Sequence, residues 1–282
     1  MNILLLGKTG QVGFELHRTL SPLGTITAPS REELNLMDEQ AVSQFLARIK
    51  PNLIVNAAAW TAVDAAEDQQ VDAEGLNAGL PKQLAKYAAA NNARLVHYSS
   101  DYVYPGTGET PWQETSPTGP LSHYGKTKLQ GDQTIEQSGA DYLIFRTSWV
   151  YSARGNNFMK TMLRLAQSKT ELNIVADQIG APTPARLIAQ VTTLAIHSPL
   201  VKGIYHLAPQ GEASWQGFAK EIFRLAGHNT TANPISTSDY PTPATRPLNS
   251  RMEVTKLERA LNIQLPTWQS QLALTLNEYL EQ

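Results

Sequence analysis

Short apolar runs alternate with longer amphipathic stretches along the first half of the chain. The apolar runs have the length of buried strands and occupy residues 3–6, 26–28, 53–57, 95–98 and 142–145. Helical periodicity covers much of the sequence between and beyond them, at residues 12–20, 41–49, 76–90 and 123–137. Such alternation is typical of βαβ units on a parallel sheet. The pattern therefore predicts an α/β fold built on a Rossmann-type, doubly wound parallel sheet of about six strands.

The pattern changes after residue 148. Helical stretches near residues 157–166, 185–196, 215–225 and 268–280 are separated by proline-rich segments such as 181–184 and 241–247. We expect residues 1–150 to form the sheet domain. Residues 151–282 should form mainly a smaller α/β lobe over the carboxyl edge of the sheet, with room for part of this segment to return to the first domain.

A glycine-rich turn follows the first predicted strand directly. Its sequence is Gly7-Lys8-Thr9-Gly10-Gln11-Val12-Gly13, and it opens the first predicted helix. In this context the first glycine permits a tight turn, the second lets the backbone approach a pyrophosphate, and the third allows the helix to pack closely on the strand. Glycines that serve only a turn are the weaker alternative at a βα junction. We therefore expect a dinucleotide to contact Gly7, Thr9, Gly10, Gln11, Val12 and Gly13.

The residues after the second predicted strand bear on the choice of cofactor. Many NAD-specific enzymes place an acidic residue there for the adenosine ribose, whereas this chain has Ser30 and Arg31. A guanidinium can pair with a 2′-phosphate, so the sequence favours NADPH, with NADH still possible and a solvated surface arginine as the alternative. The glycine turn resembles that of extended short-chain dehydrogenases/reductases, and this resemblance implies that Asn35 and Leu36 lie near the adenine. The remaining residues expected along the dinucleotide are Ala57, Ala58, Ala59, Trp60 and Thr61 after the third strand, and Tyr98 on the fourth.

Tyr124 and Lys128 are the candidate proton-donating pair. They stand four residues apart at the start of a predicted helix, which puts both side chains on one face. A free phenol has a pKa of about 10, and a nearby cation favours its ionised form, so we expect Lys128 to make Tyr124 more acidic. The Tyr-x-x-x-Lys pattern alone is common on helices. It gains weight here because it follows a nucleotide-binding turn and a strand that ends in serines.

The fourth predicted strand supplies a third catalytic candidate. It ends in Ser99 and Ser100, at the carboxyl edge where such sheets bind their ligands. The Ser100 hydroxyl can donate to a substrate carbonyl and polarise it. Ser99 is the better candidate for a capping role, and we expect His97 to be structural.

The composition excludes several classes of function. The chain has 41% hydrophobic and 17% charged residues, a net charge of -2 and no cysteine. A thiolate nucleophile, a disulfide and a Cys-ligated zinc are thus impossible, and no basic excess points to nucleic acid. The apolar start is too short to span a bilayer and lacks the features of a signal peptide. We expect a cytoplasmic protein that binds neither nucleic acid nor membrane.

The motifs together resemble one family of extended short-chain dehydrogenases/reductases, the dTDP-4-dehydrorhamnose reductases. The resemblance covers nearly the whole chain. It rests on residues 7–13, 55–59, 61–64, 100–106, 124–128 and 145–151, and continues through 155–158, 177–183 and 246–250.

The resemblance implies reduction of the C4 keto group of dTDP-4-dehydro-L-rhamnose to dTDP-L-rhamnose. A nicotinamide hydride would attack carbon while Tyr124 protonates oxygen and Lys128 holds the nicotinamide ribose. The residues implied to contact the nucleotide sugar are Ser100, Asp101, Tyr102, Trp149, Asn157 and Arg246. A buried core tryptophan and a surface ion pair remain the alternatives for Trp149 and Arg246.

Related enzymes supply the rival hypotheses. Dehydratases of this superfamily carry an Asp-Glu pair beside the catalytic serine or threonine, but here Tyr102 follows Asp101, and no cysteine is present for epimerisation. One alternative is a reductase of another 4-keto-6-deoxy nucleotide sugar. The other is a non-catalytic, NADP-binding regulatory subunit resembling that of methionine adenosyltransferase, which the complete Ser/Tyr/Lys set makes less favourable.

The resemblance also bears on assembly. Some family members dimerise through magnesium held by glutamates. Glu15 matches one of these, but Arg186 stands where a further acid is expected. Because a cation is unfavourable beside a guanidinium, we expect no metal in the active site, no magnesium-bridged dimer, and a monomer or weak homodimer.

Overall fold

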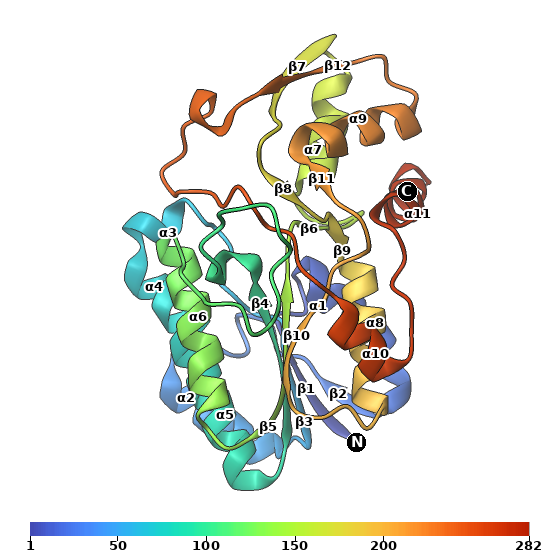
Figure 1. Ribbon diagram of the computed structural model, residues 1–282. Helices are drawn as coiled ribbons and strands as arrows, with labels where there is room; N and C mark the ends of the chain where they lie inside the picture. Colours follow the sequence, from blue (N-terminus) through green and yellow to red (C-terminus); the bar gives the residue numbers. More distant parts are fainter. Residues whose placement is uncertain (282) are drawn as a thin grey trace.

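The computed structural model describes residues 1–281, and a parallel sheet of six strands lies at its centre (Figure 1). The strand order is β10-β5-β4-β3-β1-β2, and every neighbouring pair is parallel. The chain passes from β1 outward to β2 and then crosses to β3 on the other side, so the order reverses beside β1. Ligands of such sheets bind at this reversal, at the carboxyl ends of the strands. The predicted fold class is confirmed. The strands are β1 (Asn2–Leu6), β2 (Thr25–Thr27), β3 (Leu53–Asn56), β4 (Arg94–Ser100), β5 (Asp141–Thr147) and β10 (Gly203–His206).

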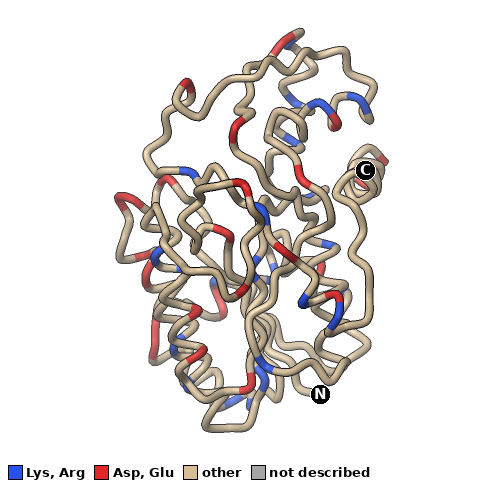
Figure 2. The backbone as a smooth tube through the Cα atoms, in the orientation of Figure 1, with Lys and Arg blue, Asp and Glu red and all other residues tan. Residues whose placement is uncertain are grey.

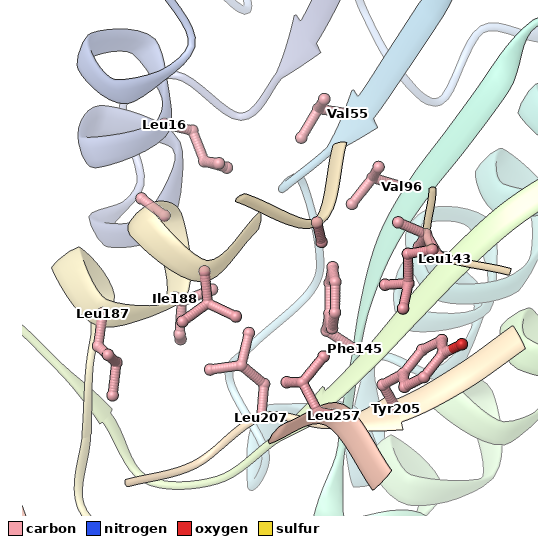
Figure 3. Close-up of a cluster of buried hydrophobic side chains, with 14 of the residues drawn as sticks. Leu16, Val55, Val96, Leu143, Phe145, Leu187, Ile188, Tyr205, Leu207 and Leu257 are labelled. Atoms are coloured by element: carbon pink, nitrogen blue, oxygen red, sulfur yellow. The ribbon is translucent and has the colours of Figure 1, made fainter. Parts of the chain in front are cut away.

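Helices cover both faces of the sheet. One face is covered by α1 (Gln11–Thr19), α8 (Ala185–His197) and α10 (Thr255–Leu261), and the other by α2 (Glu39–Ile49), α5 (Leu80–Asn91) and α6 (His123–Glu136). Because strand side chains alternate between faces, each face has its own apolar core. Figure 3 shows the core beneath α1 and α8, where sheet residues such as Val55, Val96 and Phe145 pack with Leu16 and Ile188.

The helix predicted over residues 76–90 is interrupted in the structure. The chain forms α3 (Ala65–Asp68), α4 (Gln70–Glu74), a π-helical turn η2 (Gly75–Gly79) and only then α5. The Asn77 side chain explains the interruption because it is fully buried and bonds both the backbone N and O of Trp60 and the hydroxyl of Thr127. A π-turn places this amide where a regular helix would not.

The second lobe lies beyond the carboxyl ends of the sheet strands (Figure 1). Its apolar core gathers around Phe218, Trp268 and Leu272. Its elements are α7 (Phe158–Ala166), α9 (Trp215–Ala226), α11 (Trp268–Leu280) and the short strand pairs β7 (Glu171–Val175) with β12 (Thr231–Ile235), β8 (Ile179–Gly180) with β11 (Ala213–Ser214), and β6 (Val150–Tyr151) with β9 (Thr183–Pro184). Single 3₁₀ turns complete the chain at η1 (Ser21–Leu23), η3 (Asp101–Val103) and η4 (Thr237–Asp239).

Part of the chain beyond residue 150 belongs to the sheet. Strand β10 pairs with β5 as the sixth strand, and α8 packs on α1. The hydrophobic pattern locates the other strands but not this one, because four residues without a following amphipathic helix leave little periodicity.

Charges are interspersed over both parts of the molecule (Figure 2). Within residues 1–281, no helix has both the length and the apolar character needed to cross a membrane.

Candidate active site

The glycine turn forms a close-packed cradle between β1 and α1. Gly7 has φ +82°, and a Cβ there would lie 2.6 Å from the carbonyl oxygen of Ala57. A Cβ on Gly13 would lie 2.0 Å from the carbonyl oxygen of Gly7. Gly10 is the N-cap residue of α1, and it provides no side-chain hydrogen bond to the first amides of that helix. The first amides of α1 are thus free to bind an anion, and the cradle fits a dinucleotide pyrophosphate.

Gln11 joins this turn to the second lobe. Its Oε1 accepts hydrogen bonds from Ser152 Oγ at 3.0 Å and from Asn157 Nδ2 at 2.9 Å. Asn157 also caps α7 by accepting from the Lys160 amide. The structure therefore places Asn157 against the predicted cofactor turn, where its role is to connect the two lobes.

The segment after β2 meets the glycine turn through two charged residues to which the sequence assigned no role, Glu33 and Lys8. Ser30 and Glu33 bond each other's backbone amides, at 2.6 and 3.3 Å. Lys8 Nζ lies 3.7 Å from the Glu33 carboxylate and donates to the Ala28 carbonyl. Arg31 is exposed beside this group. The predicted 2′-phosphate region thus carries two cations, Lys8 and Arg31, and two carboxylates, since Glu32 is exposed between Arg31 and Glu33.

The other residues predicted for the dinucleotide fall into two groups. Ala57 to Trp60 follow β3 and are partly buried, and Asn77 fixes the Trp60 backbone in place. Asn35 and Thr61 are exposed, whereas Leu36 packs against the core beneath α2. Of these residues, Ala57 and Ala58 lie with their backbone against Gly7, so they are the ones that reach the cradle.

Helix α6 carries Tyr124 and Lys128 to the carboxyl end of β4. Ser122 caps the helix by accepting from the Gly125 amide at 3.2 Å. Gly125 must be glycine for the helix to pack here, because a Cβ would lie 2.4 Å from the Tyr102 carbonyl oxygen. Close packing at this glycine sets Tyr124 beside the end of the strand.

Lys128 is buried and directed toward β4. Its side chain is only 2% exposed, and Nζ donates to the Tyr98 carbonyl oxygen at 2.6 Å and lies 3.4 Å from His97 Nε2. Burial lowers the pKa of Lys128 to about 8, while Asp132 opposes that change. The phenol of Tyr98 points to the other face, where its oxygen lies 2.9 Å from Thr192 Oγ1.

The expectation that Lys128 makes Tyr124 acidic is wrong in this structure. Burial raises the pKa of Tyr124, and a hydrogen bond with Ser100 opposes the rise. The ammonium instead donates to the Tyr98 carbonyl oxygen. Tyr124 therefore remains a protonated phenol near neutral pH, which is the form that a proton donor needs.

Ser100 and Asp101 lie together at the end of β4. Ser100 Oγ donates to Asp101 Oδ1 at 3.0 Å and accepts from the Tyr102 amide. Asp101 is only 1% exposed, and burial raises its pKa to about 6, against the effect of the Ser250 and Ser100 hydroxyls. A serine donor and a protonatable carboxyl thus adjoin Tyr124.

Tyr102 and Arg246 extend this group from the other side. The Tyr102 ring meets the Tyr124 ring edge-on, with centroids 5.4 Å apart. Arg246 NH1 lies 3.4 Å from the Tyr102 hydroxyl, and its NH2 donates to Asp64 Oδ2 at 2.7 Å. Arg246 therefore forms the ion pair that was the alternative to a substrate contact, and its partner is Asp64.

Trp149 belongs to an aromatic stack at the base of the second lobe. Its ring stacks on Trp215, with centroids 3.7 Å apart and planes inclined by 12°. Its backbone has φ +50°, a conformation that non-glycine residues rarely adopt. Trp215 was missed because an indole at the start of a helix carries no sequence signal for stacking.

Ser99 does not have the capping role expected of it. Its hydroxyl donates to Asp132 Oδ2 at 2.9 Å, and Arg146 Nε donates to the same oxygen at 3.1 Å. The Asp132 and Arg146 side chains are 0% and 3% exposed, so this is a buried ion pair. It lies behind Lys128 on the same face of the sheet.

Arg186 lies between two glutamates. Its Nε is 3.2 Å from Glu15, and its NH2 is 2.8 Å from Glu278. Over residues 1–281, no group of three or more acidic or histidine side chains is placed to hold a metal ion.

A glycine cradle on the first strand of a parallel sheet, next to a serine, a tyrosine and a lysine at the carboxyl end of β4, defines the class of nicotinamide-dependent short-chain reductases. The chain belongs to the family described as the RmlD substrate binding domain, whose model matches residues 1–281. It is a nicotinamide-dependent oxidoreductase.

Named relatives resemble the chain over nearly its whole length. The dTDP-4-dehydrorhamnose reductase of Salmonella typhimurium is 46% identical, with 99% of this chain and 98% of the relative covered. The crystal structure of a dTDP-4-dehydrorhamnose reductase from Clostridium acetobutylicum matches with a TM-score of 0.96 at 36% identity, over 100% of both chains. The Bacillus anthracis enzyme of the same name, solved in complex with NADP, matches with a TM-score of 0.93 at 34% identity over 98% of each chain.

Proposed function

We propose that this chain reduces the C4 keto group of dTDP-4-dehydro-L-rhamnose to give dTDP-L-rhamnose, the last step of dTDP-L-rhamnose synthesis. The observation that carries the proposal is the meeting of Ser100, Tyr124 and Lys128 at the end of β4, next to the glycine cradle between β1 and α1. The names of the family members that resemble the chain along its length support the choice of substrate.

The proposed roles follow from the geometry. A bound nicotinamide cofactor supplies the hydride that adds to the carbonyl carbon. Ser100 turns its hydroxyl to the carbonyl oxygen and polarises it. Tyr124 donates its phenolic proton to the same oxygen, which becomes the product hydroxyl. The raised pKa of Tyr124 does not hinder this step, because an alkoxide is a far stronger base than a phenolate.

We propose that the second lobe, mainly residues 151–282, holds the nucleotide sugar against this edge. Trp149 offers a flat apolar surface and Tyr102 lines the site beside Tyr124. Arg246 is placed to exchange its Asp64 partner for a diphosphate, a charge-assisted contact.

We also propose a preference for NADPH over NADH. Arg31 and Lys8 supply positive charge where a 2′-phosphate would lie, although Glu32 and Glu33 reduce it. Arg31→Ala should lower kcat/KM with NADPH by about 10- to 100-fold, the worth of one charged hydrogen bond, and leave kcat/KM with NADH nearly unchanged. Equal losses with both cofactors would contradict a 2′-phosphate role for Arg31.

We propose a monomer or weak homodimer that needs no magnesium and works in the cytoplasm. The pairing of Arg186 with Glu15 and Glu278 supports this, since a cation placed there would face a guanidinium. Size-exclusion chromatography with and without a chelator tests it. A dimer that the chelator dissociates would refute the proposal.

The decisive assay follows reduced-nicotinamide absorbance with purified protein and dTDP-4-dehydro-L-rhamnose, offering NADPH and NADH in turn. We expect absorbance to fall only with the keto sugar, and dTDP-L-rhamnose to appear by mass spectrometry. Faster turnover of another 4-keto-6-deoxy nucleotide sugar would identify that sugar as the substrate instead. Cofactor binding without any turnover would favour the regulatory-subunit alternative.

A further inference from the structure

A buried histidine stands directly behind the catalytic lysine. His97 on β4 is 1% exposed, with its Nε2 3.4 Å from Lys128 Nζ. Its other ring nitrogen, Nδ1, lies 3.2 Å from Asn56 Nδ2 at the end of β3. His97 thus bridges an amide on one strand to the lysine on α6.

The orientation of the Asn56 amide is fixed by the backbone. The Ala58 amide lies 3.2 Å from Asn56 Oδ1. A backbone N–H can only donate, so the atom facing Ala58 must be the carbonyl oxygen. The Asn56 NH₂ group therefore faces His97 Nδ1, and Nδ1 must be the acceptor.

This arrangement determines where His97 carries its proton. Burial, with a smaller contribution from Lys128, holds the pKa of His97 well below its ordinary value, so the ring is neutral. A neutral imidazole has a single N–H, and with Nδ1 accepting, that hydrogen is on Nε2. The Nε2–H group points at Lys128 Nζ. An ammonium has no lone pair to accept it, whereas a neutral amine does.

We propose that Asn56 and His97 are positioning residues that weaken the hold of Lys128 on its proton, because His97 presents to it an N–H that a neutral amine can accept and an ammonium cannot. The inference rests on the proposed reductase function. The neutral amine accepts a hydrogen bond from His97 Nε2–H and still donates to the Tyr98 carbonyl oxygen.

The other groups around Lys128 are consistent with this. From α6 itself, Asp132 favours the ammonium, but Arg146 on β5 binds that carboxylate through two nitrogens, each 3.1 Å away, and offsets its charge. The η2 turn has no titratable side chain, and the α5 lysines are exposed. On η3, Asp101 and Tyr102 act on Tyr124. The acids of α3 and α4 contact His123, through Glu67 and Glu74.

The ¹⁵N NMR spectrum of histidine-labelled wild-type protein tests the tautomer without any cofactor or turnover. His206 is an internal contrast, because it is also buried, its Nδ1 lies 3.0 Å from the Glu253 carbonyl, and its Nε2 lies 2.6 Å from the Tyr104 hydroxyl. We expect two histidines that do not titrate between about pH 5 and 9, His97 as the Nε2–H form and His206 as the Nδ1–H form. Two Nδ1–H signals, or an imidazolium at position 97, would overturn the proposal.

The pH dependence of kcat/KM tests the functional half. In His97→Gln the side-chain amide can turn its oxygen to the ammonium, so the alkaline limb should move upward by about one pH unit. His206→Gln replaces an equally buried histidine without contact to Lys128, and its limb should stay in place. If the alkaline limb of the kcat/KM pH profile moves in both variants, or in neither, a role for His97 is refuted. If the wild type turns over no keto sugar, the proposed function fails, while the NMR result still decides the tautomer.

Discussion

The two faces of the sheet differ most at its carboxyl end. Beneath α1 and α8 the side chains stay apolar or uncharged up to the strand ends, as Val96, Tyr98 and Phe145 show. Beneath α6 the same strands begin with apolar residues such as Leu95 and end in polar ones, His97 and Ser99 on β4 among them. One strand thus contributes a hydrophobic core on one face and a buried polar network on the other.

The difference shows where the fold accepts unfavourable burial. Apolar burial stabilises by about 25 cal/mol per Å² wherever it occurs. Buried charges are tolerated only when they are paired, and Asp132 with Arg146 meets that condition. The buried charges are placed behind Lys128 and Tyr124, so the polar face is the one that carries the proposed proton-donating pair.

Removing one hydroxyl from each face gives the sharpest test. Tyr124→Phe should reduce turnover by about 10²- to 10⁴-fold, the usual contribution of a general acid, with cofactor binding retained. Tyr205→Phe is the matched control on the apolar face, where only the hydrogen bond to the Val201 carbonyl is lost. It should lower the free energy of unfolding by about 1 kcal/mol and change turnover little. Steady-state rates that fall equally in both variants would contradict the division.

Breaking the buried ion pair should destabilise the protein more than removing both charges. Asp132→Leu leaves the Arg146 guanidinium without its partner and should lower the free energy of unfolding by about 3–5 kcal/mol in urea titrations. The double variant Asp132→Leu with Arg146→Met should recover most of that loss. On the apolar face, Leu143→Ala should cost about 2–5 kcal/mol, with no comparable second-site recovery. A double variant less stable than Asp132→Leu would show that the pair itself stabilises the fold.

The raised pKa of Asp101 should appear as a dependence of stability on pH. Since the folded-state pKa rises from 3.8 to about 6, the folded protein holds this proton more tightly than the unfolded chain does. The stabilising contribution is complete below about pH 4 and is lost as the pH rises through 6. Relative to Asp101→Asn, the wild type should therefore lose up to about 3 kcal/mol of unfolding free energy between pH 4 and 7. A difference that stays constant over this range would place the Asp101 carboxyl in a more hydrated setting.

Local patterns were sufficient for much of the fold and part of the site. The predicted helix over residues 123–137 matches α6 closely, and Ser122 caps its start; its buried positions, Gly125, Lys128, Asp132 and Ile135 among them, recur at helical spacing. The cradle could be predicted from the sequence because only glycine fits at positions 7 and 13. The predicted helix over residues 76–90 is helical throughout but π-helical at its start, where Asn77 bonds Trp60 and Thr127.

By itself, the sequence determined the candidate residues for the chemistry and the strands that hold them, since spacing and glycine sterics act over a few residues. Only the tertiary structure decided their protonation and partners. The direction of the Tyr124 pKa shift, the Ser99 contact with Asp132, the stack of Trp149 on Trp215 and the place of β10 in the sheet all depend on groups distant in the chain. Burial and hydrogen bonding across the fold fix such properties, because the free energy of a charge depends on everything packed around it.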